Sequence, residues 1–394
     1  MPRVAPFEAL VYDAAVAGPL DLVSAPPYDV ISEDRRSAYL SRSPWNIVHL
    51  DLAEGSHDAE AADSCYAHAA ALLNGWRAKG VLVRTPPSYF AYELGFVLDG
   101  APRRLRGLFC AMELEPWGGD VLPHEETMPG PVADRLRLLR ATHTHLSAIY
   151  GTVAGPCAPL SDLLDRATAP PAPFAIVDEE GVEHRMWSVP GEEPVAGWLA
   201  DTQLLIADGH HRYTTALAYR DERHASDGAG PWDRILTLLV DAGTEDVPVL
   251  PYHRVQVAGD PPTGGEPFAD LASLLDAVDD THVRYGTITR EADGAVEYRL
   301  HALAGEPPAV RALHEEVLDR LAPGDAIRFT HEAGAADAAV RSGEAIAAYL
   351  LPPTAPDRIS TVIERGERLP RKSTFYWPKP RTGLVLMPLD AGER

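Results

Sequence analysis

The spacing of apolar residues predicts several elements in the first part of the chain. Apolar residues recur at helical spacing from Ala59 to Lys79, and Gly80 follows, so a helix is expected to end at the glycine. Ser32, a preferred N-cap residue, precedes a second helical pattern at 33–42. Apolar and polar residues alternate over 46–52, which predicts a strand.

Turn residues between apolar runs predict further strands. Asp99-Gly100 separates two long apolar runs and is a dipeptide typical of hairpin turns. Val132, Leu136 and Leu139 share one face of an expected helix that follows a proline-rich loop. The remaining predicted elements are strands at 7–13, 146–153, 235–243 and 249–257, a helix at 160–167, a hairpin around 178–185, and a strand, turn and helix at 204–217.

These elements predict a mixed α/β fold with three consecutive regions. The expected regions are 1–115, 116–260 and 261–394, and the acidic loop at 258–268 is the candidate boundary before the last one. The middle region contains a proline-rich, acidic insertion at about 155–201.

The composition narrows the classes of function. The 394 residues are 45% hydrophobic, which is ordinary for a globular protein, and carry a formal net charge of −23. Such a charge argues against a nucleic-acid partner, because phosphate neutralisation needs a basic surface. The three cysteines, Cys65, Cys110 and Cys157, fit neither a zinc ribbon nor a disulfide framework. We therefore expect reduced thiols and a cytoplasmic protein, without a signal peptide or a membrane partner. The bias towards Ala, Arg, Gly and Asp resembles that of a high-GC bacterial genome.

The segment LLIADGHHRYTTAL, residues 204–217, is the strongest candidate site. A helix that begins after Asp208 and Gly209 would direct free N–H groups and a partial positive charge out of the turn, which favours an anion. Arg212 and the pair His210 and His211 would add donors to a phosphate, while Asp208 could hold Mg²⁺ or accept a proton. An inert helix cap and a transition-metal pair remain open, although adjacent helical histidines point about 100° apart.

Two other segments carry candidate chemistry. His124 and Glu125 lie on a loop in LPHEETMPGPVADRL, where an acid near a phosphate site could deprotonate a hydroxyl group; a solvated acidic turn is the alternative. The one strongly basic segment, RKSTFYWPKPRTG, contains Lys372, Ser373, Thr374, Lys379 and Thr382 among aromatic residues and suits a phosphate, a carboxylate or a nucleobase; a packed hairpin is the alternative. Tyr28, Asp29, Asn46 and His49 are lesser candidates.

Three common enzyme signatures are absent from the sequence. There is no G-x-S-x-G motif of a serine hydrolase, no Walker A motif, and no G-x-G-x-x-G motif after a strand.

The whole chain resembles the bacterial and archaeal family known as domain of unknown function 1015. The motifs that carry this resemblance occur in order along nearly the whole chain: APPYDVIS, SPWNIVHLDL, LPHEET, ADGHHRYTTAL, LPYHRV and KSTFYWPKPRTGLV.

The central segment, 122–219, is similar to the ParB/sulfiredoxin-like fold, which includes free-serine kinases. That resemblance implies that residues 208–212 hold nucleotide phosphates and that Glu125, in a His-Glu pair with His124, is the base that activates a hydroxyl group. It also implies that Glu125 meets the turn at Asp208 in space. His210 stands where sulfiredoxin-type reductases have a catalytic cysteine, so reductase chemistry is not expected.

The sequence thus leads to a nucleotide-dependent small-molecule kinase that phosphorylates free serine or a similar hydroxy compound. ATP, ADP or CTP would be the donor and Mg²⁺ the metal, held by Asp208. Glu125 with His124 and Asp208 would be catalytic, while residues 209–212 and 372–374 would bind the nucleotide. A non-catalytic nucleotide-binding regulator and a metal-dependent hydrolase are the alternatives, and a homodimer is the one protein assembly left open.

Overall fold

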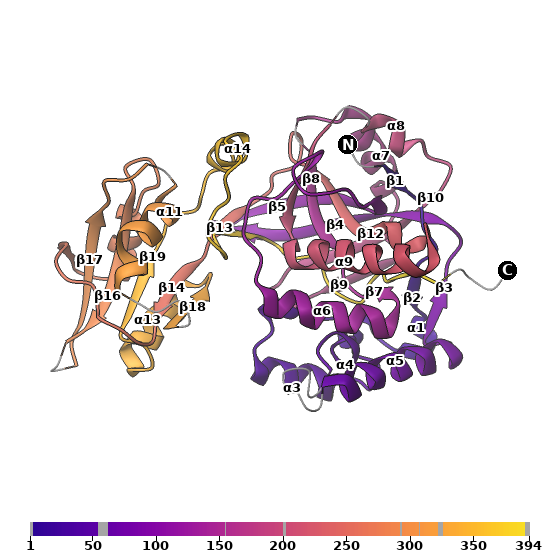
Figure 1. The fold of residues 1–394 in the computed structure, drawn as a ribbon, viewed down its shortest axis with the longest axis horizontal. Coiled ribbons are helices and arrows are strands. Elements are labelled where there is room, and N and C mark those ends of the chain that lie inside the picture. The colour runs from indigo at the N-terminus through magenta and orange to yellow at the C-terminus, as the bar shows by residue number, and fades with distance from the viewer. Residues whose placement is uncertain are drawn as a thin grey trace. The chain divides into compact units, whose positions relative to one another are not determined.

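The computed structural model describes residues 3–53, 62–153, 155–199, 202–291, 294–306, 308–321 and 326–390 (Figure 1). The chain forms two compact units, of which the first comprises 1–123, 127–247 and 378–394, and the second comprises 124–126 and 248–377. The three consecutive regions expected from the sequence differ from these units, because the chain passes between the units four times. The mixed α/β class expected from the sequence is confirmed.

The first unit contains a nine-stranded sheet in the described part of the chain. Its order is β6-β11-β8-β12-β5-β4-β10-β9, with β1 paired to β5. Neighbouring strands are antiparallel, except that β11 pairs with β6, and β12 with β8, in parallel. The strands are β1 (Val4–Ala5), β4 (Ser88–Leu98), β5 (Ala101–Glu113), β6 (Val121–Leu122), β8 (Ile149–Val153), β9 (Phe174–Val177), β10 (Glu183–Pro190), β11 (Leu204–Asp208) and β12 (Arg234–Asp241).

Several expected elements of this unit are confirmed. Asp99 and Gly100 have φ of 51° and 74° and join β4 to β5 as the predicted hairpin turn. The Ser32 side chain caps α3 (Glu33–Arg42). The helix before Gly80 is α5 (Ala62–Ala78); the start expected at 59–61 lies outside the described residues. The unit also contains two antiparallel two-stranded sheets. One pairs β2 (Leu10–Tyr12) with β3 (Leu82–Arg84), and the other pairs β7 (Thr144–His145) with β21 (Met387–Pro388).

The strand predicted at 46–52 is wrong, because Val48–Asp51 form the helix α4. The Asn46 side chain accepts a hydrogen bond from the Val48 N–H at 3.0 Å and donates to the carbonyl of Leu22 at 2.8 Å. Every residue from Asn46 to Leu52 except His49 is buried, so the short alternation did not mark one exposed and one buried face.

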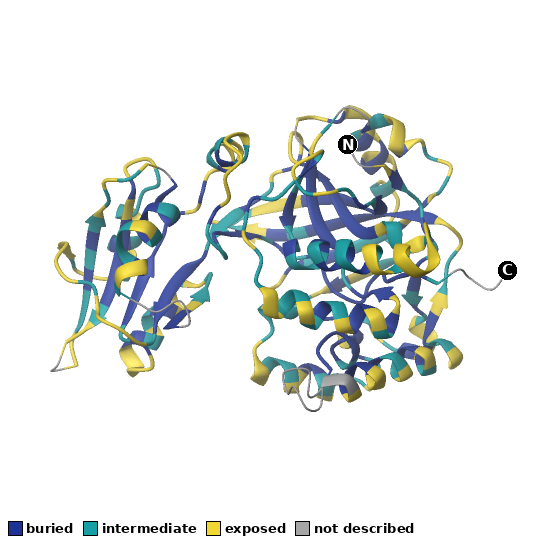
Figure 2. Cartoon of the chain, in the orientation of Figure 1, coloured by how far each residue is buried: buried dark blue, intermediate teal, exposed yellow. Residues whose placement is uncertain are grey.

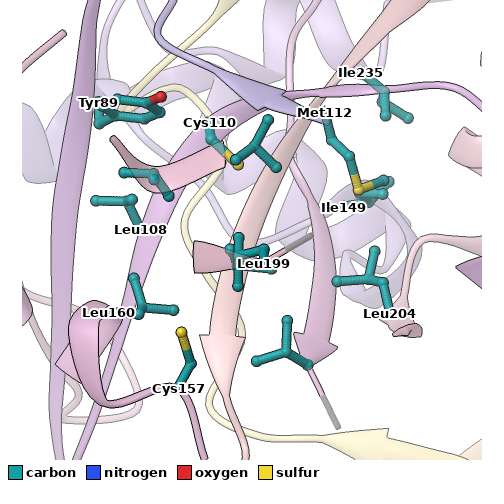
Figure 3. Close-up of a cluster of buried hydrophobic side chains, with 14 of the residues drawn as sticks. Tyr89, Leu108, Cys110, Met112, Ile149, Cys157, Leu160, Leu199, Leu204 and Ile235 are labelled. Carbon is teal, nitrogen blue, oxygen red and sulfur yellow. The ribbon is translucent and has the colours of Figure 1, made fainter. Parts of the chain in front are cut away.

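Helices cover the sheet and enclose its core. Figure 1 shows α6 (Pro129–Thr142) beside α9 (His210–Asp227), and Figure 2 shows the buried central strands against the exposed outer sides of α3 and α5. Figure 3 shows part of the apolar core, where Cys110, Ile149, Leu160 and Leu204 point towards one another. The other helices are α1 (Ala14–Ala17), α2 (Leu20–Val23), α7 (Ala158–Thr168), α8 (Val195–Trp198), and the 3₁₀ turns Tyr28–Val30 and Pro231–Asp233.

The second unit is built on an antiparallel six-stranded sheet of order β15-β17-β16-β19-β14-β18. Leu274 of α10 and Val340 of α13 pack on Ile288 and Leu300 of the sheet. The strands are β14 (His253–Gln256), β15 (Glu266–Phe268), β16 (Arg284–Arg290), β17 (Val296–Ala302), β18 (Ile327–Thr330) and β19 (Ala347–Leu350), with a separate pair β13 (Val249–Pro251) and β20 (Thr374–Tyr376). The helices are α10 (Leu271–Ala277), α11 (Ala309–Leu313), a π-helical turn (His314–Leu318), α12 (Asp319–Leu321), α13 (Ala333–Ser342) and α14 (Pro356–Glu364).

No helix in the described ranges is long and apolar enough to cross a membrane.

Candidate functional site

The predicted strand, turn and helix at 204–217 are confirmed as β11, Gly209 and α9. Gly209 has a φ of +97°, and a Cβ atom there would lie 2.8 Å from Cγ2 of Ile149, so the turn requires glycine. The helix begins without a side-chain cap, while its first internal bond runs from the Tyr213 N–H to the Gly209 carbonyl at 2.9 Å. The positive end of an 18-residue helix therefore begins directly after Asp208.

The Asp208 carboxylate lies between two cations of the first unit. Its Oδ2 accepts a hydrogen bond from Arg212 at 2.5 Å, and its Oδ1 pairs with the Lys379 ammonium group. All three side chains are at most 14% exposed. Burial raises the pKa of Asp208, but the two cations more than offset burial, so this pKa lies below the ordinary value. The group of two cations and one anion carries a net positive charge.

Arg212 is held in place by the segment before β8. Its guanidinium donates to the Ser147 hydroxyl at 3.3 Å and to the Ala148 carbonyl, in addition to its bond with Asp208. These bonds fix the guanidinium on one side of the turn, so Arg212 is positioned before any ligand arrives.

The two histidines point to different partners. His210 is buried and stacks on Trp117, with ring centroids 6.1 Å apart. His211 accepts a hydrogen bond on Nε2 from the Met128 N–H at 2.9 Å and so connects α9 to the start of α6. The described residues contain no group of three or more His, Cys, Asp or Glu that could hold a metal ion. The arrangement gives no support to a shared transition metal.

Further charges surround this turn. Arg135 is buried, lies 4.3 Å from the Tyr28 ring centroid and donates to Asp51 at 2.9 Å. Burial raises the pKa of Asp51, although Arg135 opposes the effect. The Asp29 carboxylate acts on Asp208 and raises its pKa. Tyr28 and Asp29 were lesser candidates in the sequence because they follow a proline-rich turn. No feature of the sequence pointed to Asp51.

Arg381 fixes the segment that carries Lys379. Its buried guanidinium donates to Glu179 at 2.8 Å and to the Ser24 carbonyl at 2.9 Å, while its backbone N–H donates to the Tyr92 hydroxyl at 3.2 Å. Burial would raise the pKa of Glu179, but Arg381 and a second arginine lower it to about 2. Arg381, two residues after Lys379, thus connects its own segment to three distant ones. The sequence analysis did not predict this network.

Glu125 belongs to the second unit, where a loop encloses its carboxylate. Oε1 accepts hydrogen bonds from the N–H groups of Ser373 at 3.0 Å and Thr374 at 2.8 Å, and from the Thr374 hydroxyl at 2.8 Å. Oε2 accepts from the Lys372 N–H at 3.0 Å. Lys372 has a φ of 55°, which turns successive N–H groups towards one point. Glu125 thus lies with all three loop residues that the sequence singled out.

His124 and Arg254 support this loop. His124 is fully buried, and its Nε2 lies 2.7 Å from the Thr374 hydroxyl; since that hydroxyl donates to Glu125, its oxygen accepts from His124. Arg254 is also buried and donates to the carbonyls of Tyr252 at 2.6 Å and Arg371 at 3.4 Å. Burial lowers the pKa of Arg254 to about 9. The loop is therefore held from both sides.

The candidate residues fall into two groups. Residues 208–212 lie with Lys379 in the first unit, and residues 124–125 lie with 372–374 in the second. The expected meeting of Glu125 with the turn at Asp208 joins residues of different units and stays a prediction.

Comparisons with known proteins place the chain in a family. Three similar solved structures have low TM-scores. They are a free serine kinase in complex with AMP (13% identity, TM-score 0.35, 65% of this chain and 83% of that chain), a conserved hypothetical protein from Pyrococcus furiosus (14%, 0.35, 68% and 90%), and SbnI with C-terminal truncation from Staphylococcus aureus (12%, 0.32, 71% and 87%). No curated protein matches. The model of the family described as protein of unknown function (DUF1015) matches residues 4–302, so the chain belongs to this family.

Proposed function

We propose that this protein binds a nucleotide and transfers a phosphoryl group to the hydroxyl of a small molecule, free serine or a similar compound. The observation that carries the proposal is the uncapped start of α9 beside Arg212 and Lys379, around Asp208. Helix N–H groups and two cations are the donors that phosphate oxygens require. Two cations therefore meet at one buried carboxylate in a chain with a net charge of −23.

The site binds an anion by exchange of partners. Lys379 and Arg212 both contact Asp208, so an arriving phosphate competes with that carboxylate for them. Arg212 keeps its bonds to Ser147 and Ala148 during this exchange, whereas Lys379 has a flexible stem and can follow the phosphate. We assign Arg212 to positioning and Lys379 to charge neutralisation, which is the main protein contribution in phosphoryl transfer.

A Mg²⁺ ion fits this site only together with a nucleotide. Both oxygens of Asp208 already accept from cations, and the described residues form no metal cluster by themselves. Mg²⁺ commonly uses one or two carboxylates and takes its other ligands from phosphates and water. Asp208 would supply one ligand after Lys379 leaves it, and the ion would neutralise phosphate charge.

Glu125, together with His124, is proposed as the base that activates the acceptor hydroxyl group. Glu125 already accepts four hydrogen bonds from residues 372–374, three of them on Oε1, so it becomes a stronger base when one of those donors turns away. Lys372, Ser373 and Thr374 are proposed to bind the nucleotide through the same loop movement. The chemistry of this half of the site is therefore coupled to the position of the loop.

The test is incubation with ATP, ADP or CTP, Mg²⁺ and a panel of hydroxy amino acids, followed by mass spectrometry. We expect one phosphorylated product and consumption of one nucleotide. Lys379→Met should abolish nucleotide binding, whereas Lys79→Met, which changes an exposed lysine in the same unit, should leave binding intact. No thermal shift with any nucleotide, together with no product, would refute the proposal.

A second candidate, a nucleotide-binding regulator without chemistry, is favoured by one observation. Both oxygens of each acid expected to be catalytic, Asp208 and Glu125, already accept hydrogen bonds from the protein. This candidate predicts nucleotide binding that depends on Lys379 but yields no phosphorylated product with any acceptor. The same mass-spectrometry experiment therefore separates the two functions.

A further inference from the structure

A cavity of about 490 Å³ opens in the first unit beside the ends of two central strands of the large sheet. Its volume lies in the usual range of small-molecule sites. The end of β5, the start of β12 and the turn before it, β21, and residues near β1 and β3 line its wall. The wall combines apolar side chains such as Phe7 and Met387 with six charged ones.

Most charges of the cavity wall are already paired. Arg84 forms ion pairs with Glu8 at 3.0 Å and with Asp390 at 2.6 Å. The Asp233 carboxylate pairs with His224 and accepts from the Gly230 N–H at 2.9 Å. These groups shape the wall, and each already has a partner within the protein.

Glu113 and Arg234 are the exception. They are directly opposite each other, at the end of β5 and the start of β12. The Glu113 N–H donates to the Arg3 carbonyl at 2.8 Å, so the pair is of the type without cross-strand bonds, in which side chains lie closest. Yet neither side chain forms a hydrogen bond or an ion pair with any residue in the described ranges. The cavity thus holds one available anion beside one available cation.

The cavity adjoins the segment that positions Arg212. Nε2 of His145 lies 3.2 Å from the Arg234 carbonyl oxygen, and β7, which contains His145, pairs with β21 of the cavity wall. Two residues further along, Ser147 and then Ala148 bind the Arg212 guanidinium. The cavity and the turn at Asp208 therefore contact one short segment of backbone, at the same end of the sheet's strands.

We propose that this cavity binds a zwitterionic α-amino acid, with its ammonium group on Glu113 and its carboxylate on Arg234. Two opposite charges on adjacent strands match the two opposite charges on one α-carbon, and arginine binds carboxylates through paired donors. The apolar residues of the wall, such as Phe7 and Met387, would contact a small side chain. The assignment of this amino acid as the phosphoryl acceptor rests on the function proposed above, whereas its binding does not.

The test measures binding of L-serine to the full chain, by calorimetry or ligand-observed NMR, without nucleotide. L-serine amide, which lacks the carboxylate, and N-acetyl-L-serine, which lacks the ammonium group, are the probes for the two charges. We expect L-serine to bind and each derivative to bind at least about tenfold more weakly, because each loses a charged partner.

The variants Glu113→Gln and Arg234→Gln locate the site. Each should weaken L-serine binding at least about tenfold and leave nucleotide binding unchanged, while Arg104→Gln, a half-exposed arginine elsewhere on β5, should change neither. Unaltered affinity in both variants, or no binding of L-serine or any other amino acid, would overturn the cavity assignment. If the wild-type protein binds L-serine but binds no nucleotide, the proposed kinase function is overturned while the cavity assignment stands.

Discussion

Replacing Lys379 with methionine isolates the contribution of the cation that faces Asp208. Methionine keeps an unbranched side chain of similar length and removes only the ammonium group. Lys379 is 7% exposed and Asp208 14%, so water compensates little for the lost partner. Breaking a buried ion pair costs about 3–5 kcal/mol, and because Arg212 still contacts the carboxylate we expect about 3 kcal/mol.

The loss of stability should depend on pH in a defined direction. The pKa of Asp208 is below its ordinary value in the folded protein, so the ionised carboxylate stabilises the fold above the unfolded pKa of about 3.9. This contribution disappears as the pH falls through the folded pKa. Lys379→Met should therefore be less stable than the wild type at pH 7, and the difference should shrink as the pH falls below about 4.

Thermal unfolding followed by circular dichroism at pH 7 and pH 3.5 measures both effects. A cost of about 3 kcal/mol corresponds to a melting temperature roughly 6–12 °C lower at pH 7 for a unit of this size. Lys79→Met is the matched control. Lys79 is exposed, and its Nζ lies over the Trp45 ring, 5.3 Å from the centroid. Equal melting temperatures of Lys379→Met and the wild type at pH 7 would refute the argument from the buried pair.

Two further substitutions and one pH titration test other parts of the structure. Glu125→Ala should expose the N–H groups of the loop at Thr374, and hydrogen exchange there should accelerate at least about tenfold; unchanged exchange would show that the carboxylate does not hold the loop. Gly209→Ala should cost about 2 kcal/mol or more in a denaturant titration, because φ is +97° and Cβ would meet Ile149; a neutral result would contradict the turn geometry. Burial lowers the pKa of His145 to about 4, so its ring resonances should not titrate between pH 7 and 5.5, and a midpoint near 6.5 would contradict its burial.

Much of the local structure followed from the sequence because its signals are local. Ser32 caps the expected helix, Asp99-Gly100 forms the expected hairpin, and Gly209 separates the expected strand and helix. Each of these signals acts over a few residues. The strand predicted at 46–52 is wrong for the opposite reason. Burial on all sides and the hydrogen bonds of Asn46 determine the conformation there, and an alternating sequence pattern shows neither.

The partners of the candidate residues could be predicted only in part. The sequence paired Glu125 with the turn at Asp208 through a resemblance and assigned residues 372–374 to nucleotide binding, whereas in the structure the Glu125 carboxylate accepts hydrogen bonds from that loop. It did not assign Lys379 to Asp208, which lies 171 residues away. Contacts at such a separation depend on the topology of the whole unit, and a single sequence contains no local signal for them.

The state of the two acids determines where chemistry can begin. Asp208 is paired with Lys379 and Arg212, and Glu125 accepts four hydrogen bonds from its loop, so each carboxylate becomes a stronger base when a partner leaves it. A phosphate that attracts Lys379 would release one oxygen of Asp208, so nucleotide binding itself would supply the missing step in the first unit. Glu125 has no such exchange within its own unit, because backbone N–H groups move only with the loop. If Lys379→Met removes nucleotide binding while Glu125→Ala removes only turnover, Asp208 and Lys379 act in binding and the loop at 372–374 controls the reaction.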